Sequence, residues 1–231
     1  MLFRTVANML HPPIIICGCP GSGTSLVTRM LRHAGFFAGT DAGPLESRKF
    51  HESNIFRKVN QQLLSESIDF PHAPKSKRQF VDHLKYCSQH LQAMQEKIDL
   101  DRILEIYWGD ARDEQAIWGW KDPRNSANLM IWRTQFPDLR VLVIERFWSK
   151  KMLTQDGGSA SGNWFRTEST SAVRNQYLNP AGAKGLDVYR VNFDQLLNDV
   201  NELSKLLNWA RLPVEPADHF EHFLKLANVR T

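Results

Sequence analysis

The segment Cys17–Leu26, which reads CGCPGSGTSL, has the composition of an anion-binding loop. It follows the apolar run Ile14–Ile16 and precedes apolar residues at helical spacing, so the sequence predicts a strand, a turn and a helix N-terminus. Backbone N–H groups and the helix dipole make such a turn a phosphate site. Gly18 and Gly23 match the glycine frame of a Walker A loop, but Thr24 stands where that loop has lysine. The loop therefore predicts phosphate binding without the cation that ATP chemistry uses.

Two cations lie at the ends of further apolar runs. Lys121 follows Ala116–Trp120, and Arg146 follows Arg140–Glu145. If these runs are parallel strands, both cations lie at the carboxyl edge of the sheet, where α/β proteins bind ligands. A lysine there can stabilise charge that develops on a leaving group, although a lysine that ends a strand at the surface is the alternative. Arg124 either contacts a ligand or pairs with a nearby aspartate.

The rest of the chain supplies elements that would position these residues. We expect one domain over residues 1–231, an α/β fold with a central parallel sheet between two helical layers (α/β/α). The predicted strands are Pro13–Gly18, Ala116–Trp120, Arg140–Glu145 and Leu186–Asn192. The predicted helices are one after Ser22, Ser53–Leu64, one long helix with an apolar stripe from Phe80 to Ile98, Ser126–Gln135 and Phe193–Asn208. Trp118, Trp120 and Trp132 are expected in the core.

Composition excludes several classes of function. A hydrophobic content of 42% suits a globular domain, and a net charge of +4 suits an anionic ligand but is too mild for a nucleic-acid partner. No apolar run is long enough to span a membrane. Three cysteines cannot all pair, and Cys17 and Cys19 are too close in sequence to bridge each other without distortion. These features predict reduced thiols and a cytoplasmic location.

Longer segments carry a resemblance to a known family. The segment Gly119–Trp148, with its KDP element, helix, FP turn, strand and arginine, resembles the catalytic core of sulfotransferases that use 3′-phosphoadenosine-5′-phosphosulfate (PAPS). Pro20–Thr24 is similar to the family's P-(R/K)-S-G-T loop, and Val188–Val200 is similar to its Y-E-D-L segment. The resemblance implies the P-loop NTPase-like sulfotransferase fold. It also implies in-line transfer of a sulfonate group from PAPS to a hydroxyl or amine, with adenosine 3′,5′-bisphosphate as the product and no metal.

The resemblance assigns roles to individual residues. Lys121 would contact the leaving group, and Arg146 and Thr154 would hold the 3′-phosphate. The 5′-phosphosulfate would bind Pro20, Gly21, Ser22, Gly23, Thr24 and Ser25. Gly21 departs from the family pattern, because it replaces a loop arginine or lysine. Either Lys121 acts alone, or Arg29, Arg48 or Arg124 reaches the site, or the chain binds the donor without efficient turnover.

A general base is needed to withdraw the acceptor's proton. In relatives that use glutamate, the base lies some twenty residues beyond the loop, a window that here contains Asp41, Glu46 and Glu52. Glu46 is our first choice and Asp41 the second, with His51 as the histidine alternative.

Two other functions stay open at this point. A P-loop nucleotide kinase or ATPase would use Glu145 to hold Mg²⁺, although Thr24 speaks against it. A non-catalytic nucleotide-binding protein would explain Gly21.

His83, Cys87 and His90 share a helical surface that suggests a metal site, but packing of Cys87 in the apolar stripe is the favoured interpretation. The acceptor, whether small molecule, carbohydrate, lipid or peptide tyrosine, and the oligomeric state are not predicted.

Overall fold

The computed structural model describes residues 9–18, 22–45, 51–67, 77–146 and 183–213, together with Glu221 and Lys225. The strands in this part of the chain are β1 (Ile14–Gly18), β2 (Gly119–Lys121), β3 (Arg140–Glu145) and β4 (Asp187–Asn192). The helices are α2 (Thr24–His33), α3 (Asn54–Ser65), α4 (Lys77–Gln89), α5 (Leu91–Glu96), α6 (Leu100–Trp108), α7 (Asn125–Gln135), α11 (Phe193–Leu196) and α12 (Val200–Ala210).

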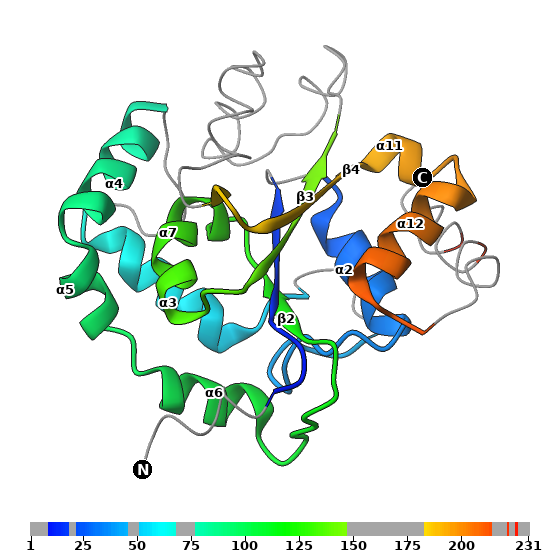
Figure 1. The fold of residues 1–231 in the computed structure, drawn as a ribbon, viewed down its shortest axis with the longest axis horizontal. Coiled ribbons are helices and arrows are strands. Elements are labelled where there is room, and N and C mark those ends of the chain that lie inside the picture. Colours follow the sequence, from blue (N-terminus) through cyan, green and yellow to red (C-terminus); the bar gives the residue numbers. More distant parts are fainter. Residues whose placement is uncertain are drawn as a thin grey trace.

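The four strands form one parallel sheet in the order β2-β1-β3-β4. Strand β1 lies between β2 and β3, so the loop after β1 starts near the middle of the sheet. Helices cover both faces, with α3, α4, α5 and α7 on one side and α2, α11 and α12 on the other (Figure 1). The predicted α/β class with a central parallel sheet between helical layers is confirmed.

Alternating side chains of the buried strands fill two separate cores. Ile15 and Cys17 of β1 pack in the core under α3 to α7, while Ile14 and Ile16 pack in the core under α2 and α12. Successive side chains of a strand point to opposite faces, so a continuously apolar strand is typical of a sheet covered on both sides. The three tryptophans expected in the core, Trp118, Trp120 and Trp132, are fully buried in the first of these cores.

Strand β2 approaches β1 unusually closely. The register pairs Ile14 with Gly119 and Ile16 with Lys121, and a Cβ placed on Gly119 would lie 1.9 Å from the carbonyl oxygen of Ile14. Glycine is therefore required for the backbones to pair in this way. The sequence prediction for this strand, 116–120, was displaced, because the regular ladder begins only at Gly119 and Trp118 makes an isolated bridge to Phe37.

Two helix predictions were wrong in detail, and one helix was missed. The long helix ends at Gln89, and α5 starts after His90, although the apolar stripe continues through both helices. The predicted helix 193–208 is divided into α11 and α12, because Asp199 adopts an extended conformation and caps α12 through its side chain. Helix α6 was not predicted; Asp99 caps it and its buried side chains, including Tyr107 and Trp108, join the first core.

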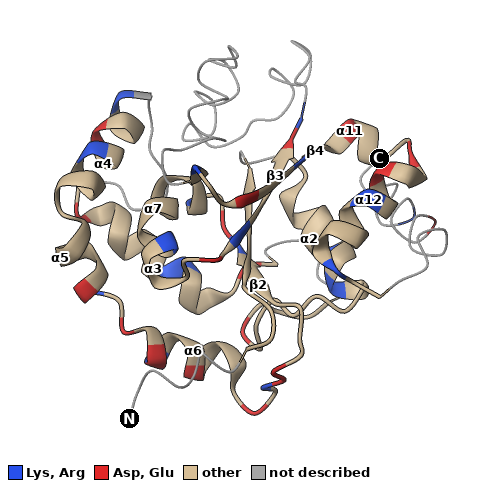
Figure 2. Ribbon diagram, in the orientation of Figure 1, with Lys and Arg blue, Asp and Glu red and all other residues tan. Residues whose placement is uncertain are grey.

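The surface carries both signs of charge. Figure 2 shows basic and acidic residues on both helical layers, with acidic residues prominent on α6 and the loop after it. No helix among the described residues has the length and apolar character needed to cross a bilayer.

Cys17 and Cys87 are free thiols buried in the core, and burial raises the pKa of each to about 12. Cys19 lies outside the described residues.

Candidate active site at the carboxyl edge of the sheet

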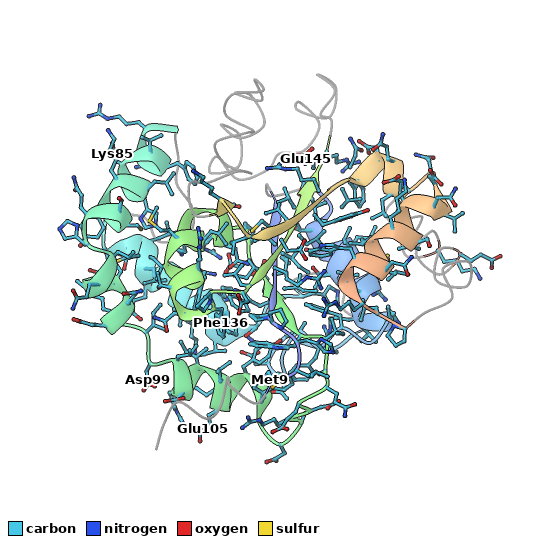
Figure 3. The ribbon with its side chains drawn as sticks, viewed as in Figure 1. Met9, Lys85, Asp99, Glu105, Phe136 and Glu145 are labelled. Carbon is cyan, nitrogen blue, oxygen red and sulfur yellow. The ribbon has the colours of Figure 1, made fainter. Side chains whose placement is uncertain are left out.

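The carboxyl ends of the four strands bring the candidate residues to one edge of the sheet. Strand β1 leads toward α2, β2 ends at Lys121, β3 is followed by Arg146 and β4 runs directly into α11. Glu145, the last residue of β3, marks this edge in Figure 3. The sheet therefore gathers four segments that are far apart in sequence, as expected for an α/β ligand site.

The start of helix α2 has the character of an anion site. Its N-cap is Gly23, whose φ of 95° is left-handed, and no side chain caps the helix or places an acidic group in its first turn. The first N–H groups of a helix have no intrahelical partner. The hydroxyl oxygen of Ser22 is buried and has no hydrogen-bond partner among the described residues. Donors and the helix dipole together favour a bound phosphate or sulfate group here.

Lys121 lies between this helix and a carboxylate. Its ammonium Nζ donates to Glu52 Oε1 at 2.7 Å and to the hydroxyl of Ser25, in the first turn of α2, at 3.3 Å. The Lys121 side chain is 2% exposed and that of Glu52 11% exposed. Burying an ion pair costs desolvation free energy, which the attraction between the charges offsets only when their geometry is good. Three segments therefore meet at one ammonium group: the end of β2, the start of α2 and the residues that precede α3.

The residues after Lys121 form a second buried ion pair. Arg124 Nη1 donates to both carboxylate oxygens of Asp122, at 2.9 and 3.1 Å, and the Arg124 backbone N–H donates to the same carboxylate at 2.8 Å. Burial raises the pKa of Asp122 to about 6; Arg124 opposes the rise, and nearby Glu52 adds to it. Arg124 therefore pairs with Asp122, which is one of the two alternatives left open by the sequence.

Arg146 contacts the segment that starts α11. Its guanidinium lies 5.0 Å from the centre of the Phe193 ring, and its Nε is 3.4 Å from Asp194 Oδ1. The Asn192 side chain caps α11 by accepting from two backbone N–H groups, which fixes the turn after β4. Arg146 is thus a partly buried cation at the same edge as Lys121.

A family model described as the sulfotransferase family matches residues 12–216. The chain belongs to the sulfotransferase family. The matched region contains all the described residues of the site, from Ser22 to Asp194. Membership supports a transferase activity for this chain.

Two solved structures resemble the chain in fold. Sulfotransferase STF1 from Mycobacterium tuberculosis matches with a TM-score of 0.50 at 17% identity, over 95% of this chain and 72% of that one. Sulfotransferase STF9 from Mycobacterium avium matches with a TM-score of 0.48 at 14% identity, over 94% and 68%. The search of curated proteins found no match. The likeness to STF1 agrees with the α/β architecture.

Within this sulfotransferase, the two described alternatives for the general base have other partners. Asp41 Oδ2 accepts the backbone N–H of Ile55 at 2.7 Å, so Asp41 stabilises the start of α3. His51 is 1% exposed, and its Nδ1 is 2.9 Å from Arg32 Nη1. Because guanidinium only donates, this histidine nitrogen accepts. Glu52 is the carboxylate in contact with Lys121; sequence analysis placed it in the window of candidates but did not choose it.

Several assigned positions of the sulfotransferase lie outside the described residues. These are Pro20, Gly21, Arg48, Glu46 and Thr154, and their roles stay predictions. Of the other cations considered as replacements for a loop lysine, Arg29 donates through Nε to the carbonyl of Leu45 at 3.0 Å. Among the candidate cations that the structure describes, Lys121 contacts the first turn of α2 through the Ser25 hydroxyl.

The sites predicted by the other interpretations have structural roles. Glu145 accepts from Arg190 Nη1 at 2.8 Å, which ties β3 to β4. Cys87 is buried in the core, as the packing interpretation predicted, and its Sγ lies 3.3 Å from His83 Nε2. His90 stacks on Tyr86 at the surface. Among the described residues, no group of three or more His, Cys, Asp and Glu side chains could hold a metal ion.

Proposed function

We propose that this sulfotransferase moves a sulfonate group from PAPS to a hydroxyl or amine acceptor by in-line displacement. The observation that carries the proposal is the position of the Lys121 ammonium, between Ser25 at the start of α2 and Glu52. It brings a cation and a carboxylate within hydrogen-bond distance of each other beside an anion-binding helix start. In-line transfer needs both groups: one for the leaving oxygen and one for the acceptor's proton.

The chain's own residues fit the phosphate groups of the donor. The uncapped N–H groups at the start of α2 and the buried Ser22 hydroxyl suit the 5′-phosphate. Arg146 at the end of β3 suits the 3′-phosphate, together with Thr154 by resemblance. Gly23 at the N-cap has a left-handed φ of 95° and no side chain that could cap the first N–H groups.

The donor supplies a sulfuryl group attached to a phosphate leaving group. Glu52 accepts the proton of the acceptor hydroxyl while the acceptor oxygen bonds to sulfur. Lys121 stabilises the negative charge that develops on the bridging oxygen as the sulfur–oxygen bond breaks. A buried ammonium is effective in this role because little water screens it. Small molecules, carbohydrates and lipids are the acceptor classes we propose to test.

Calorimetric titration tests the donor site first. Adenosine 3′,5′-bisphosphate is titrated into wild type and Arg146→Ala, in parallel with ATP plus Mg²⁺. We expect selective binding of the bisphosphate that Arg146→Ala weakens. Binding of ATP alone would overturn the proposal and favour a nucleotide kinase.

Transfer assays with PAPS and a panel of hydroxyl acceptors then test the catalytic roles. Glu52→Gln is expected to bind the bisphosphate and to lose transfer, which general-base catalysis places at about 10²- to 10⁴-fold. Glu46→Gln is the matched comparison. If Glu46→Gln abolishes transfer and Glu52→Gln does not, the proton goes to Glu46 instead.

A further inference from the structure

We propose that Asn60 and Asn125 are positioning residues, whose amide bridge fixes the distance between Lys121 and Glu52. The inference rests on the proposed function and adds two residues to its machinery. Asn60 lies in the middle of α3, and Asn125 is the first residue of α7. Both are 0% exposed, and Asn60 Nδ2 donates to Asn125 Oδ1 at 2.9 Å. Neither residue contacts the ion pair directly in the described hydrogen bonds, so their effect must pass through the backbone.

The amide of Asn125 connects the two strands that carry the site. Its Oδ1 also accepts from the indole N–H of Trp120 at 3.0 Å, and its Nδ2 donates to the carbonyl of Ile16 at 3.1 Å. Trp120 directly precedes Lys121 in β2, and Ile16 is the residue of β1 that pairs with Lys121. Asn125 Nδ2 also donates to the carbonyl of Trp120 at 3.5 Å, so one side chain contacts the backbones of both strands beside Lys121.

The amide of Asn60 is held equally firmly from the other side. Its Oδ1 accepts from Asn128 Nδ2 at 2.9 Å and from the indole N–H of Trp132 at 2.8 Å. Around these bonds lies an aromatic cluster in which the ring of Phe56, also on α3, stacks on Trp120 at 3.7 Å. Apolar packing alone tolerates small shifts of a helix, whereas directional hydrogen bonds in a dry core favour one arrangement. The amides therefore select one position of α3 against β2.

Helix α3 carries this constraint to Glu52. Ser53 is the N-cap of α3, its hydroxyl accepts from the backbone N–H of Phe56, and Glu52 immediately precedes it. A shift of α3 along or about its axis thus moves the Glu52 backbone. Lys121 is anchored separately, through β2. The 2.7 Å contact between them depends on how α3 and β2 are fixed to each other.

His83 provides a matched control within the same network. It lies on α4, and its Nε2 is 2.9 Å from Asn128 Oδ1 while its Nδ1 is 2.6 Å from the Ser67 hydroxyl. It is buried like the two asparagines, but its side-chain hydrogen bonds reach neither β1 nor β2. Its loss should cost stability without moving Lys121.

The experiment compares Asn60→Asp and the milder Asn60→Ser with His83→Gln in the full chain. An ionised Asp keeps the acceptor for Asn128 and Trp132 but removes the donor to Asn125. We expect both Asn60 variants to bind adenosine 3′,5′-bisphosphate within about twofold of wild type and to lose kcat by about 10- to 100-fold, the scale of a small misplacement. His83→Gln should lower Tm without changing kcat.

A second readout does not depend on turnover. Acylation of Lys121 by an amine-selective reagent, followed by mass spectrometry of the native protein, should be faster in the Asn60 variants than in wild type and His83→Gln. If wild type transfers no sulfonate while this labelling pattern holds, the proposed function fails and the positioning role stands. Equal labelling of Lys121 in all variants, or an equal loss of kcat in His83→Gln, would overturn the positioning role.

Discussion

The ring of Phe193 occupies the space into which a side chain at Gly23 would project. A Cβ on Gly23 would lie 2.2 Å from Phe193 Cδ2, and the same ring lies under the guanidinium of Arg146. The first turn of α11 thus contacts both the N-cap of α2 and the cation after β3. Contact with one aromatic ring couples the proposed 5′- and 3′-phosphate sites.

Gly23→Ala is expected to lower both stability and affinity for adenosine 3′,5′-bisphosphate. Gly35→Ala is the matched control, since Gly35 has a similar φ of 98° but open space around the added Cβ. Left-handed backbone alone costs an alanine about 1–2 kcal/mol. Urea unfolding should give that loss for Gly35→Ala and a larger loss for Gly23→Ala, which Phe193→Leu partly restores. Equal losses for the two alanine variants would show that the Phe193 ring can move aside without a cost in stability.

The buried pair Lys121–Glu52 should show strong coupling in a double-mutant cycle. Lys121→Met or Glu52→Gln alone leaves one buried charge without its partner, which costs about 3–5 kcal/mol. The double variant removes both charges, so its free energy of unfolding should exceed that of either single variant while transfer stays abolished. Additive losses in urea unfolding would contradict this prediction.

Asp122 should make stability fall as pH rises from about 4 to about 6. Its pKa is raised from 3.8 to about 6 in the folded chain, so between these values the folded state holds a proton that the unfolded state has released. Stability decreases with pH wherever the folded state binds more protons. Comparison of wild type with Asp122→Asn by urea unfolding from pH 4 to 7 isolates this contribution. A difference between them that is independent of pH would refute it.

His83 should make stability rise with pH, the opposite of the effect of Asp122. Burial lowers its pKa below 6.5, so the folded chain resists protonation that the unfolded chain accepts. The contribution of the neutral His83 ring to the stability of the folded chain is fully present above pH 6.5. It is lost as pH falls through the folded-state pKa. His83→Gln should therefore flatten the acid side of the stability profile, measured by thermal unfolding from pH 5 to 7.5. If the profile keeps its slope, another group is responsible for it.

Asp194→Asn should increase the affinity for adenosine 3′,5′-bisphosphate. The Asp194 carboxylate lies 3.4 Å from Arg146 Nε, and it would repel a phosphate bound to that arginine. Because the pair is partly exposed, we expect a gain of only about 2- to 5-fold. AMP, which has no 3′-phosphate, should show no change, and Glu145→Gln is the control because that carboxylate pairs with Arg190. Calorimetry measures the affinity of each variant for each nucleotide. If Asp194→Asn also binds AMP more tightly, the gain does not come from the 3′-phosphate.

Most of the sheet was predictable because β1 and β3 are short apolar runs and β4 is rich in Val and Tyr. Periodicity could not find the break at His90, since the stripe from Phe80 to Met94 remains on one side across it. Helix α6 was missed although its signal is present: Asp99 at the N-cap and apolar residues four apart at Ile103 and Tyr107.

The positions of Lys121 and Arg146 at strand ends could be predicted, whereas the contact between Lys121 and Glu52 could not. Lys121 and Arg146 stand at strand ends, and topology alone brings strand ends together. Three carboxylates lay in the window after the loop, and spacing could not rank them. Glu52 contacts Lys121 because α3 packs against α7 and β2 through Asn60, a contact between residues far apart in sequence.

The close approach at Gly119 bears on how relatives of this chain can be recognised. Any of the nineteen other residues would overlap the Ile14 carbonyl, so a chain with a side chain at this position must pair its first two strands differently. A glycine two residues before a strand-end lysine therefore indicates this close pairing of the two strands, and it can be recognised from sequence alone. Divergent homologues that keep this glycine should also keep the lysine at the same depth beside the loop, even where the loop's own basic residue has been lost.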